Sequence, residues 1–86
     1  MKHRFEVIVS LKRGLLDPQA KAVEGSLPTI GWTNVSDVRV GKHVELTVDA
    51  ESAEAARAQV EEMARRLLSN PVIEVFHILS VEEVPG

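Results

Sequence analysis

Hydrophobic and polar residues alternate along three stretches of the chain, and each alternation predicts a β-strand. The first stretch covers residues 4–11, where every odd-numbered side chain is apolar. Two more cover residues 35–40 and 43–48, which are separated only by Gly41 and Lys42. A period of two is typical of a strand with one buried face. A two-residue link that contains a glycine predicts a tight hairpin between the second and third strands.

Two longer stretches carry the signals of helices. Asp17 offers an N-cap acceptor and Pro18 suits the first helical position, so a helix begins there and ends near Pro28. A second helix begins after Asp49 or Ser52, either of which can cap it. Its apolar side chains recur three and four residues apart and form one stripe, made of Ala56, Val60, Met63, Ala64, Leu67 and Leu68.

The last predicted strand, residues 72–79, is apolar on both faces. One face carries Phe76 and Ile78, and the opposite face carries Ile73 and Val75. A sheet with helices on one side buries only one of its faces within the chain, so a second apolar face needs a partner or a covering loop. We expect Phe76 and Ile78 to lie on that second face and to mediate self-association, with a covering loop as the alternative.

The predicted elements follow the order β-α-β-β-α-β, which is the split βαβ arrangement of ferredoxin-like folds. Right-handed crossovers would place both helices on one face of a four-stranded antiparallel sheet. The sequence therefore predicts an α+β, ferredoxin-like fold in which residues 1–86 form a single domain.

Composition and charge narrow the classes of function. The 86 residues include 10 Lys and Arg against 13 Asp and Glu, for a net charge of −3. Nucleic-acid binding depends on clustered cations, so no nucleic-acid partner is expected. The absence of cysteine excludes disulfides and thiol catalysis. No apolar run approaches the roughly 18 residues of a membrane span, which predicts a cytoplasmic protein without membrane contact. So short a chain buries only a modest core, and this favours self-association.

Few residues suggest chemistry of their own. His3, His43 and His77 are far apart in the sequence and form no metal-binding motif, so no metal site is expected. The basic loop formed by residues 12–14 precedes a predicted helix and could hold an anion, but Asp17 competes for the same N–H groups. No catalytic residue is predicted.

Trp32, the only tryptophan, lies in a polar segment between predicted elements. Tryptophan is enriched among residues that anchor interfaces, and it is also large enough to close the end of a small core. Both roles of Trp32 remain open at this point.

An RNA-binding module of this topology would carry aromatic residues on its central strands, and residues 43–48 contain none. Among the functions that proteins of this topology carry, two classes remain for this sequence: a ligand-sensing module, or a subunit that works by contact with other chains.

Several short segments, taken together, identify a resemblance. They are Leu11-Lys12 with Leu16-Asp17-Pro18-Gln19, then Val38-Arg39-Val40-Gly41-Lys42 with Glu45-Leu46, then Leu67-Leu68-Ser69-Asn70-Pro71-Val72-Ile73-Glu74. In this order and spacing they resemble the PurS family, the small subunit of phosphoribosylformylglycinamidine (FGAM) synthase. The resemblance extends from about residue 4 to residue 84, with Ala20 where the family often has glycine.

The resemblance implies a noncatalytic subunit of a purine-biosynthesis ligase. PurS-like proteins assemble with an ATP-dependent synthetase subunit, PurL, and a glutaminase subunit, PurQ. The complex converts formylglycinamide ribonucleotide, glutamine and ATP into formylglycinamidine ribonucleotide. A PurS homodimer or dimer of dimers would bridge the larger subunits and support ammonia transfer. The resemblance also implies that ATP and Mg are used by the synthetase subunit and that this chain binds no cofactor.

Four residues are candidate contacts with those partners, because turn and charged residues on rigid scaffolds are common recognition sites. They are Asp17 and Gln19 at the start of the first helix, and Arg39 and Lys42 beside the predicted hairpin. Capping already explains Asp17, whereas Arg39 and Lys42 have no local explanation in the sequence. One alternative function is a small-metabolite-sensing regulatory module of the same topology. A small hydrolase that uses the basic loop for an anion comes third.

Overall fold

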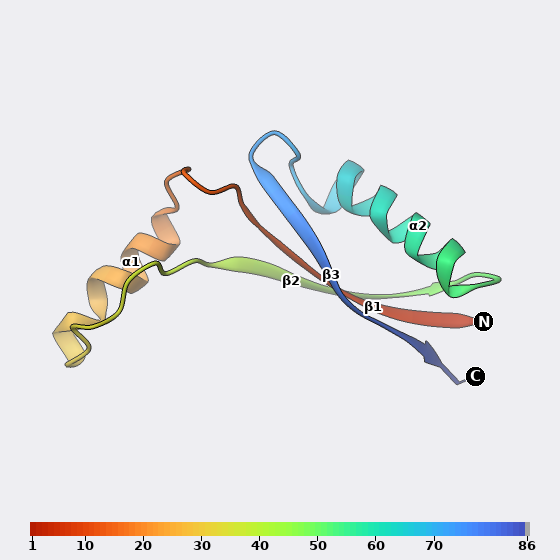
Figure 1. Cartoon of the computed structure of the whole chain (residues 1–86), viewed down its shortest axis with the longest axis horizontal. Coiled ribbons are helices and arrows are strands. Elements are labelled where there is room, and N and C mark those ends of the chain that lie inside the picture. Colours follow the sequence, from red (N-terminus) through yellow and green to blue (C-terminus); the bar gives the residue numbers. More distant parts are fainter. Residues whose placement is uncertain (86) are drawn as a thin grey trace.

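The computed structural model describes residues 1–85, which form an elongated molecule with extents of 51 × 29 × 14 Å. The elements in chain order are β1 (Lys2–Leu11), α1 (Pro18–Ser26), the 3-10 turn η1 (Pro28–Ile30), β2 (Gly41–Asp49), α2 (Ala53–Met63), the π-helical turn η2 (Ala64–Leu68) and β3 (Glu74–Val84). Figure 1 shows α2 alongside the sheet and α1 at the end of the long axis opposite the chain termini.

The sheet is antiparallel, with β1 in the centre of the order β2-β1-β3. The alternation in β1 suits a central strand, since its odd-numbered side chains Phe5, Val7 and Val9 are apolar and all three are buried in the structure. Residues directly opposite one another share a face, and Val7 lies opposite Val44 on β2 and Ile78 on β3. The predicted α+β class, with an antiparallel sheet and two helices, is confirmed.

One helix, α2, covers one face of this sheet. Its buried residues Ala56 and Val60 are four positions apart, and the buried Ala64 continues the same row into η2. Alanine lets the helix backbone approach the strands closely, while Met63 and Leu67 of the predicted stripe are exposed. We call the covered face of the sheet the inner face and the opposite face the outer face. The core cluster consists of Phe5, Val7, Val9, Val48, Ala56 and Val60.

The sheet has three strands among the described residues, and the predicted strand at residues 35–40 is wrong. Those residues form no strand, and the chain enters β2 directly at Gly41. Gly41 lies opposite Ser10, and a Cβ atom there would lie 2.9 Å from the carbonyl oxygen of Val9. The glycine therefore permits a close approach between β1 and β2. It does not form the hairpin turn that its position between two alternating runs had suggested.

The prediction that both helices lie on one face of the sheet is also wrong. Helix α1 packs mainly against η1 and lies beyond the end of the sheet (Figure 1). Ala20 is its only buried residue. We call residues 12–40 the arm, and β1, β2, α2, η2 and β3 together the body. Without a strand at 35–40 to extend the sheet, the arm has no surface of the body to cover.

Phe76 and Ile78 lie on the inner face, which corrects the predicted orientation of the last strand. They pair with Val9 and Val7, and both pack half-buried against the core cluster. The exposed large apolar residues of this region are Val72 and Ile73 just before the strand, and Leu79 and Val81 within it. Any self-association through the outer face therefore involves other side chains than Phe76 and Ile78.

Trp32 lies in the arm and is 57% exposed, so it does not close the end of the core. Its role as an interface anchor stays a prediction.

Within residues 1–85, neither helix has the length and apolar character that crossing a bilayer requires.

Candidate partner-docking site

Asp17, Gln19, Arg39 and Lys42 come together where the arm joins the body. Asp17 and Arg39 line a hollow of about 400 Å³ between the arm segments. Asp17, Gln19 and Lys42 line a second hollow of about 230 Å³. The two hollows adjoin, since both are lined by Leu11, Asp17 and Val40. We call the four residues and these hollows the docking corner.

Asp17 holds the start of α1. Its Oδ1 accepts hydrogen bonds from the backbone N–H of Gln19 at 2.9 Å and of Ala20 at 3.2 Å. Pro18 occupies the first turn, where its missing N–H costs no hydrogen bond. The predicted cap is thus confirmed, and it leaves the exposed Gln19 side chain at the rim of the smaller hollow.

Arg39 and Lys42 have structural partners that the sequence did not reveal. Arg39 Nη2 donates to the carbonyl oxygen of Leu11 at 2.5 Å, and this ties the end of the arm to the end of β1. Lys42 Nζ donates to the carbonyl oxygen of Leu68 at 2.7 Å, and this ties the start of β2 to the end of η2. Both residues are exposed, so each can stabilise the corner and still meet a partner chain.

The larger hollow carries both signs of charge. Its lining includes four basic residues, Lys12, Arg13, Lys21 and Arg39, and three acidic ones, Asp17, Glu24 and Asp37. Glu24 is already engaged, since its Oε2 accepts from the N–H of Val38 at 3.3 Å. Basic residues outnumber acidic ones by only one, and such a nearly balanced lining matches a polar protein surface better than an anion site, where positive charge predominates.

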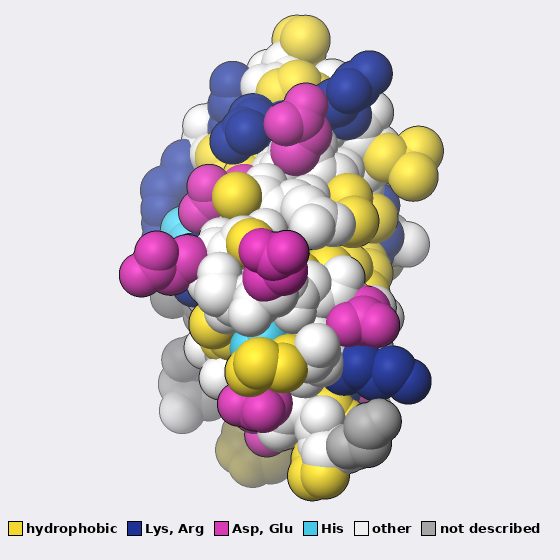
Figure 2. Space-filling model, turned by 90° about the vertical axis from the view of Figure 1, so that its right-hand side faces the viewer, with side chains coloured by type: hydrophobic (Ala, Val, Ile, Leu, Met, Phe, Trp, Pro, Cys, Tyr) yellow, Lys and Arg dark blue, Asp and Glu magenta, His cyan; other side chains and the backbone are white. Residues whose placement is uncertain are grey.

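Charges are also mixed at the far end of the molecule. Figure 2 views the end that carries the chain termini, and basic, acidic and hydrophobic side chains are interspersed there. One ion pair at this end joins the N-terminal ammonium group of Met1 to Asp49 at 3.1 Å. The face that Figure 2 shows therefore lacks the continuous basic surface that nucleic-acid binding requires.

The three histidines do not meet in space. His3 is buried on the inner face, while His43 and His77 lie on the outer face on β2 and β3. Sequence reasoning missed the neighbours of His43, which are Glu6 and Glu45. Their proximity depends on the register between β1 and β2, and no local motif reports it.

The fold and the docking corner define a small α+β protein with an exposed arm. The model of the family described as PurS, phosphoribosylformylglycinamidine (FGAM) synthase, matches residues 4–82. The PurS subunit of Bacillus subtilis is 43% identical over 82 residues, which is 95% of this chain and 95% of that protein.

Solved structures agree with this match. PurS from Thermus thermophilus has a TM-score of 0.86 and 39% identity over 99% of this chain and 100% of that one. A chain of PurLQS from Thermotoga maritima has a TM-score of 0.83 and 30% identity over 98% of this chain and 99% of that one. The chain belongs to the PurS family, which confirms the resemblance seen in the sequence, and it is a PurS-type subunit of FGAM synthase.

Proposed function

We propose that this chain is the noncatalytic subunit that bridges a PurL-like synthetase and a PurQ-like glutaminase in FGAM synthase. The observation that carries the proposal is the similarity to a chain of PurLQS from Thermotoga maritima, which covers 98% of this chain. The docking corner supports it, because a rigid junction of arm and body offers exposed polar side chains to a partner. The complex acts in the cytoplasm, and neither nucleic acid nor membrane is a partner of this chain.

The mechanism is one of geometry. Glutamine hydrolysis at the glutaminase releases ammonia, and in water at neutral pH most of it would be protonated and no longer nucleophilic. A docked complex that restricts water between the two sites preserves the reactive form. In this proposal ATP and Mg are bound by the synthetase subunit, and the present chain contributes the contacts that keep the two sites aligned.

Self-association is part of the proposal, as a homodimer or a dimer of dimers. The arm exposes large apolar residues, among them Leu16 at 73% and Ile30 at 71% exposure. A short chain with a small core gains stability when a second copy covers such residues. Sedimentation equilibrium tests this proposal: a monomer at micromolar concentration would contradict it.

Reconstitution tests the bridging role. Purified synthetase and glutaminase are assayed for formylglycinamidine ribonucleotide with glutamine as the nitrogen source, with and without this chain. We expect strong glutamine-dependent turnover only when the chain is present, and little dependence on it when ammonium chloride replaces glutamine. Full glutamine-dependent activity from the two larger subunits alone would overturn the proposal.

Substitutions at the docking corner test where the partners bind. Gln19→Ala removes an exposed side chain and leaves the backbone N–H that Asp17 caps. If Gln19 is a central contact, the affinity for the other subunits falls at least about 30-fold, which corresponds to the loss of about 2 kcal/mol or more that marks an interface hot spot. Gln59→Ala, at an exposed position on α2 outside both hollows, is the matched control and should leave the affinity unchanged.

The comparisons favour the bridging subunit over a metabolite-sensing module. The hollow of about 400 Å³ falls within the size range of small-molecule sites, so the sensor remains a distinct test outcome. Saturable calorimetric binding of nucleotides or amino acids to the isolated chain would point to a sensor, and its absence agrees with a subunit that works by contact.

A further inference from the structure

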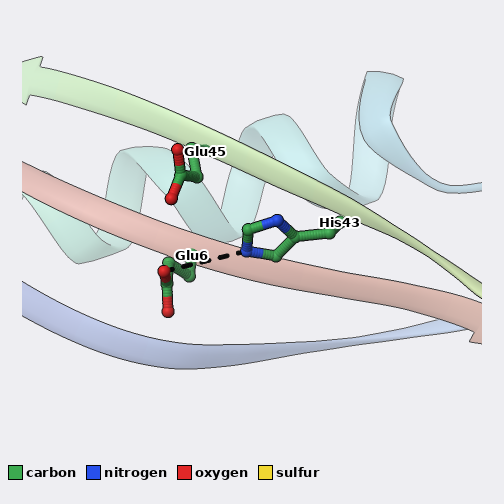
Figure 3. A group of neighbouring side chains, drawn as sticks. All are labelled: Glu6, His43 and Glu45. Carbon is green, nitrogen blue, oxygen red and sulfur yellow. Dashed lines mark ion pairs between the residues drawn. The ribbon is translucent and has the colours of Figure 1, made fainter.

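Three side chains that can bind metal converge on the outer face of the sheet. Glu6 lies on β1, whereas His43 and Glu45 lie on β2. Figure 3 shows all three on the same side of the strands, with α2 behind the sheet. The register brings them together, because Glu6 is directly opposite Glu45 and His43 is two residues away on the same face. One ligand atom from each lies within 4.8 Å of the other two.

The charges of this cluster favour a cation. Glu6 and Glu45 face each other directly across two strands, an arrangement in which like charges destabilise the pair. Nε2 of His43 lies 3.8 Å from Oε1 of Glu6 and offers a nitrogen ligand when the ring is neutral. Arg4, two residues before Glu6 on the same face, is in an ion pair with Glu82 of β3. A divalent ion would neutralise both carboxylates of the cluster at once.

The three donors also select the class of ion. One imidazole nitrogen with two carboxylate oxygens suits Zn²⁺ and neighbouring transition metals, whereas Mg²⁺ and Ca²⁺ prefer sites made only of oxygen. With bonds of about 2.0–2.2 Å, ligand atoms around a tetrahedral Zn²⁺ are about 3.4 Å apart. The ligand atoms of the cluster lie within 4.8 Å of one another, so they need to close by at most about 1.4 Å. All three side chains are at least partly exposed, and rotation about their own bonds supplies that movement without shifting either strand.

We propose that Glu6, His43 and Glu45 form a Zn²⁺ site that staples β1 to β2 on the outer face, with water as the fourth ligand. The site is independent of the docking corner, because none of its three residues lines either hollow. It also goes beyond the bridging role, so each proposal can fail without the other.

Calorimetric titration of the full chain with zinc chloride tests the site. The wild-type chain is expected to bind one Zn²⁺ per copy. Glu45→Gln keeps the size of the side chain and removes its charge, and His43→Gln removes the ring. Each should weaken binding at least about 10-fold, since loss of a residue that only orients a metal ligand already costs about 10- to 100-fold. In nitrogen-15 spectra, the ring nitrogens of His43 should shift on zinc addition.

His77→Gln is the matched control. His77 and His43 both lie opposite Ile8, one on each side of β1, so His77 is a second exposed histidine on the same face. This variant should bind Zn²⁺ as tightly as the wild-type chain. The proposal is overturned if wild-type binding is not saturable, if Glu45→Gln binds as tightly as wild type, or if His77→Gln loses as much affinity as His43→Gln. Thermal unfolding of each variant verifies that the sheet is intact.

Discussion

The body and the arm are stabilised in different ways. In the body, three strands and α2 bury a continuous core that includes Phe5 and Val60. In the arm, Ala20 is the only buried residue, while Leu16, Ile30 and Trp32 are exposed. Burying a large apolar side chain stabilises a fold by about 1.5–3 kcal/mol, and the arm gains little of this within the chain. The difference indicates that the body folds on its own contacts. Under the proposed function, another chain completes the arm.

Polar bonds hold the arm together and join it to the body instead. Within the arm, Asp17 caps α1 and Glu24 accepts from the N–H of Val38. Between arm and body, Arg39 donates to the carbonyl oxygen of Leu11. Each such bond contributes about 0.5–1.5 kcal/mol net, and exposure to water weakens the contribution further. These bonds fix the direction of the arm and add little to the free energy of unfolding.

The largest expected effect comes from the core of the body. Phe5→Ala should lower the free energy of unfolding by about 3–5 kcal/mol, because it removes a fully buried ring and leaves a cavity. Urea denaturation of the isolated chain measures this loss. Trp32→Ala is the matched control in the arm, and in the monomeric chain at nanomolar concentration it should stay within about 0.5 kcal/mol of wild type. Equal losses from the two variants would contradict the division between body and arm.

A second effect tests the close approach of β1 and β2. Gly41→Ala would place a Cβ atom 2.9 Å from the carbonyl oxygen of Val9, so the strands must shift. We expect a loss of about 1–3 kcal/mol, which is typical of overpacking. Gly25→Ala is the control in α1, where a Cβ meets nothing within 4 Å and a helix gains stability from alanine. If the urea midpoint of unfolding of Gly41→Ala equals that of the wild-type chain, the close approach at Gly41 does not constrain the pairing of β1 with β2.

The smallest effect separates the two helix caps. Ser52 caps α2 by accepting from the N–H of Ala55 at 3.1 Å, and Asp17 caps α1. Loss of either cap costs about 1 kcal/mol of helix stability. Ser52→Ala should lower the stability of the whole body, whereas Asp17→Ala should speed hydrogen exchange in α1 only. A matching loss of global stability in Asp17→Ala would show that α1 folds together with the body.

Local signals in the sequence predicted the elements that local interactions determine. The cap at Asp17 and the buried alternation of β1 were readable from neighbouring residues. For α2 the sequence left Asp49 and Ser52 open as the cap, and the structure has Ser52. The role of Gly41 could not be predicted from the sequence, because a glycine between two alternating runs is compatible with a turn and with a close contact between strands.

The sequence likewise did not determine which side chains of β3 lie on the inner face of the sheet. Both faces of this strand are apolar, and only its pairing with β1 places one of them inward. The register between these strands also shifts between Glu6 and Val7, which breaks the period of two. The candidate sites divide in the same way. Local sequence singled out the four candidate docking residues, whose role stays a prediction, whereas the cluster around His43 depends on the pairing of β1 with β2.

Hydrogen exchange measured across a range of partner concentrations tests the division between body and arm most directly. The chain is diluted from micromolar to nanomolar concentration, and the synthetase and glutaminase subunits are then added. We predict that protection of amides in residues 18–40 rises with the concentration of partner chains, while β1 and α2 keep the same protection throughout. Protection of the arm that equals that of β1 at every dilution, and that the other subunits leave unchanged, would contradict the account.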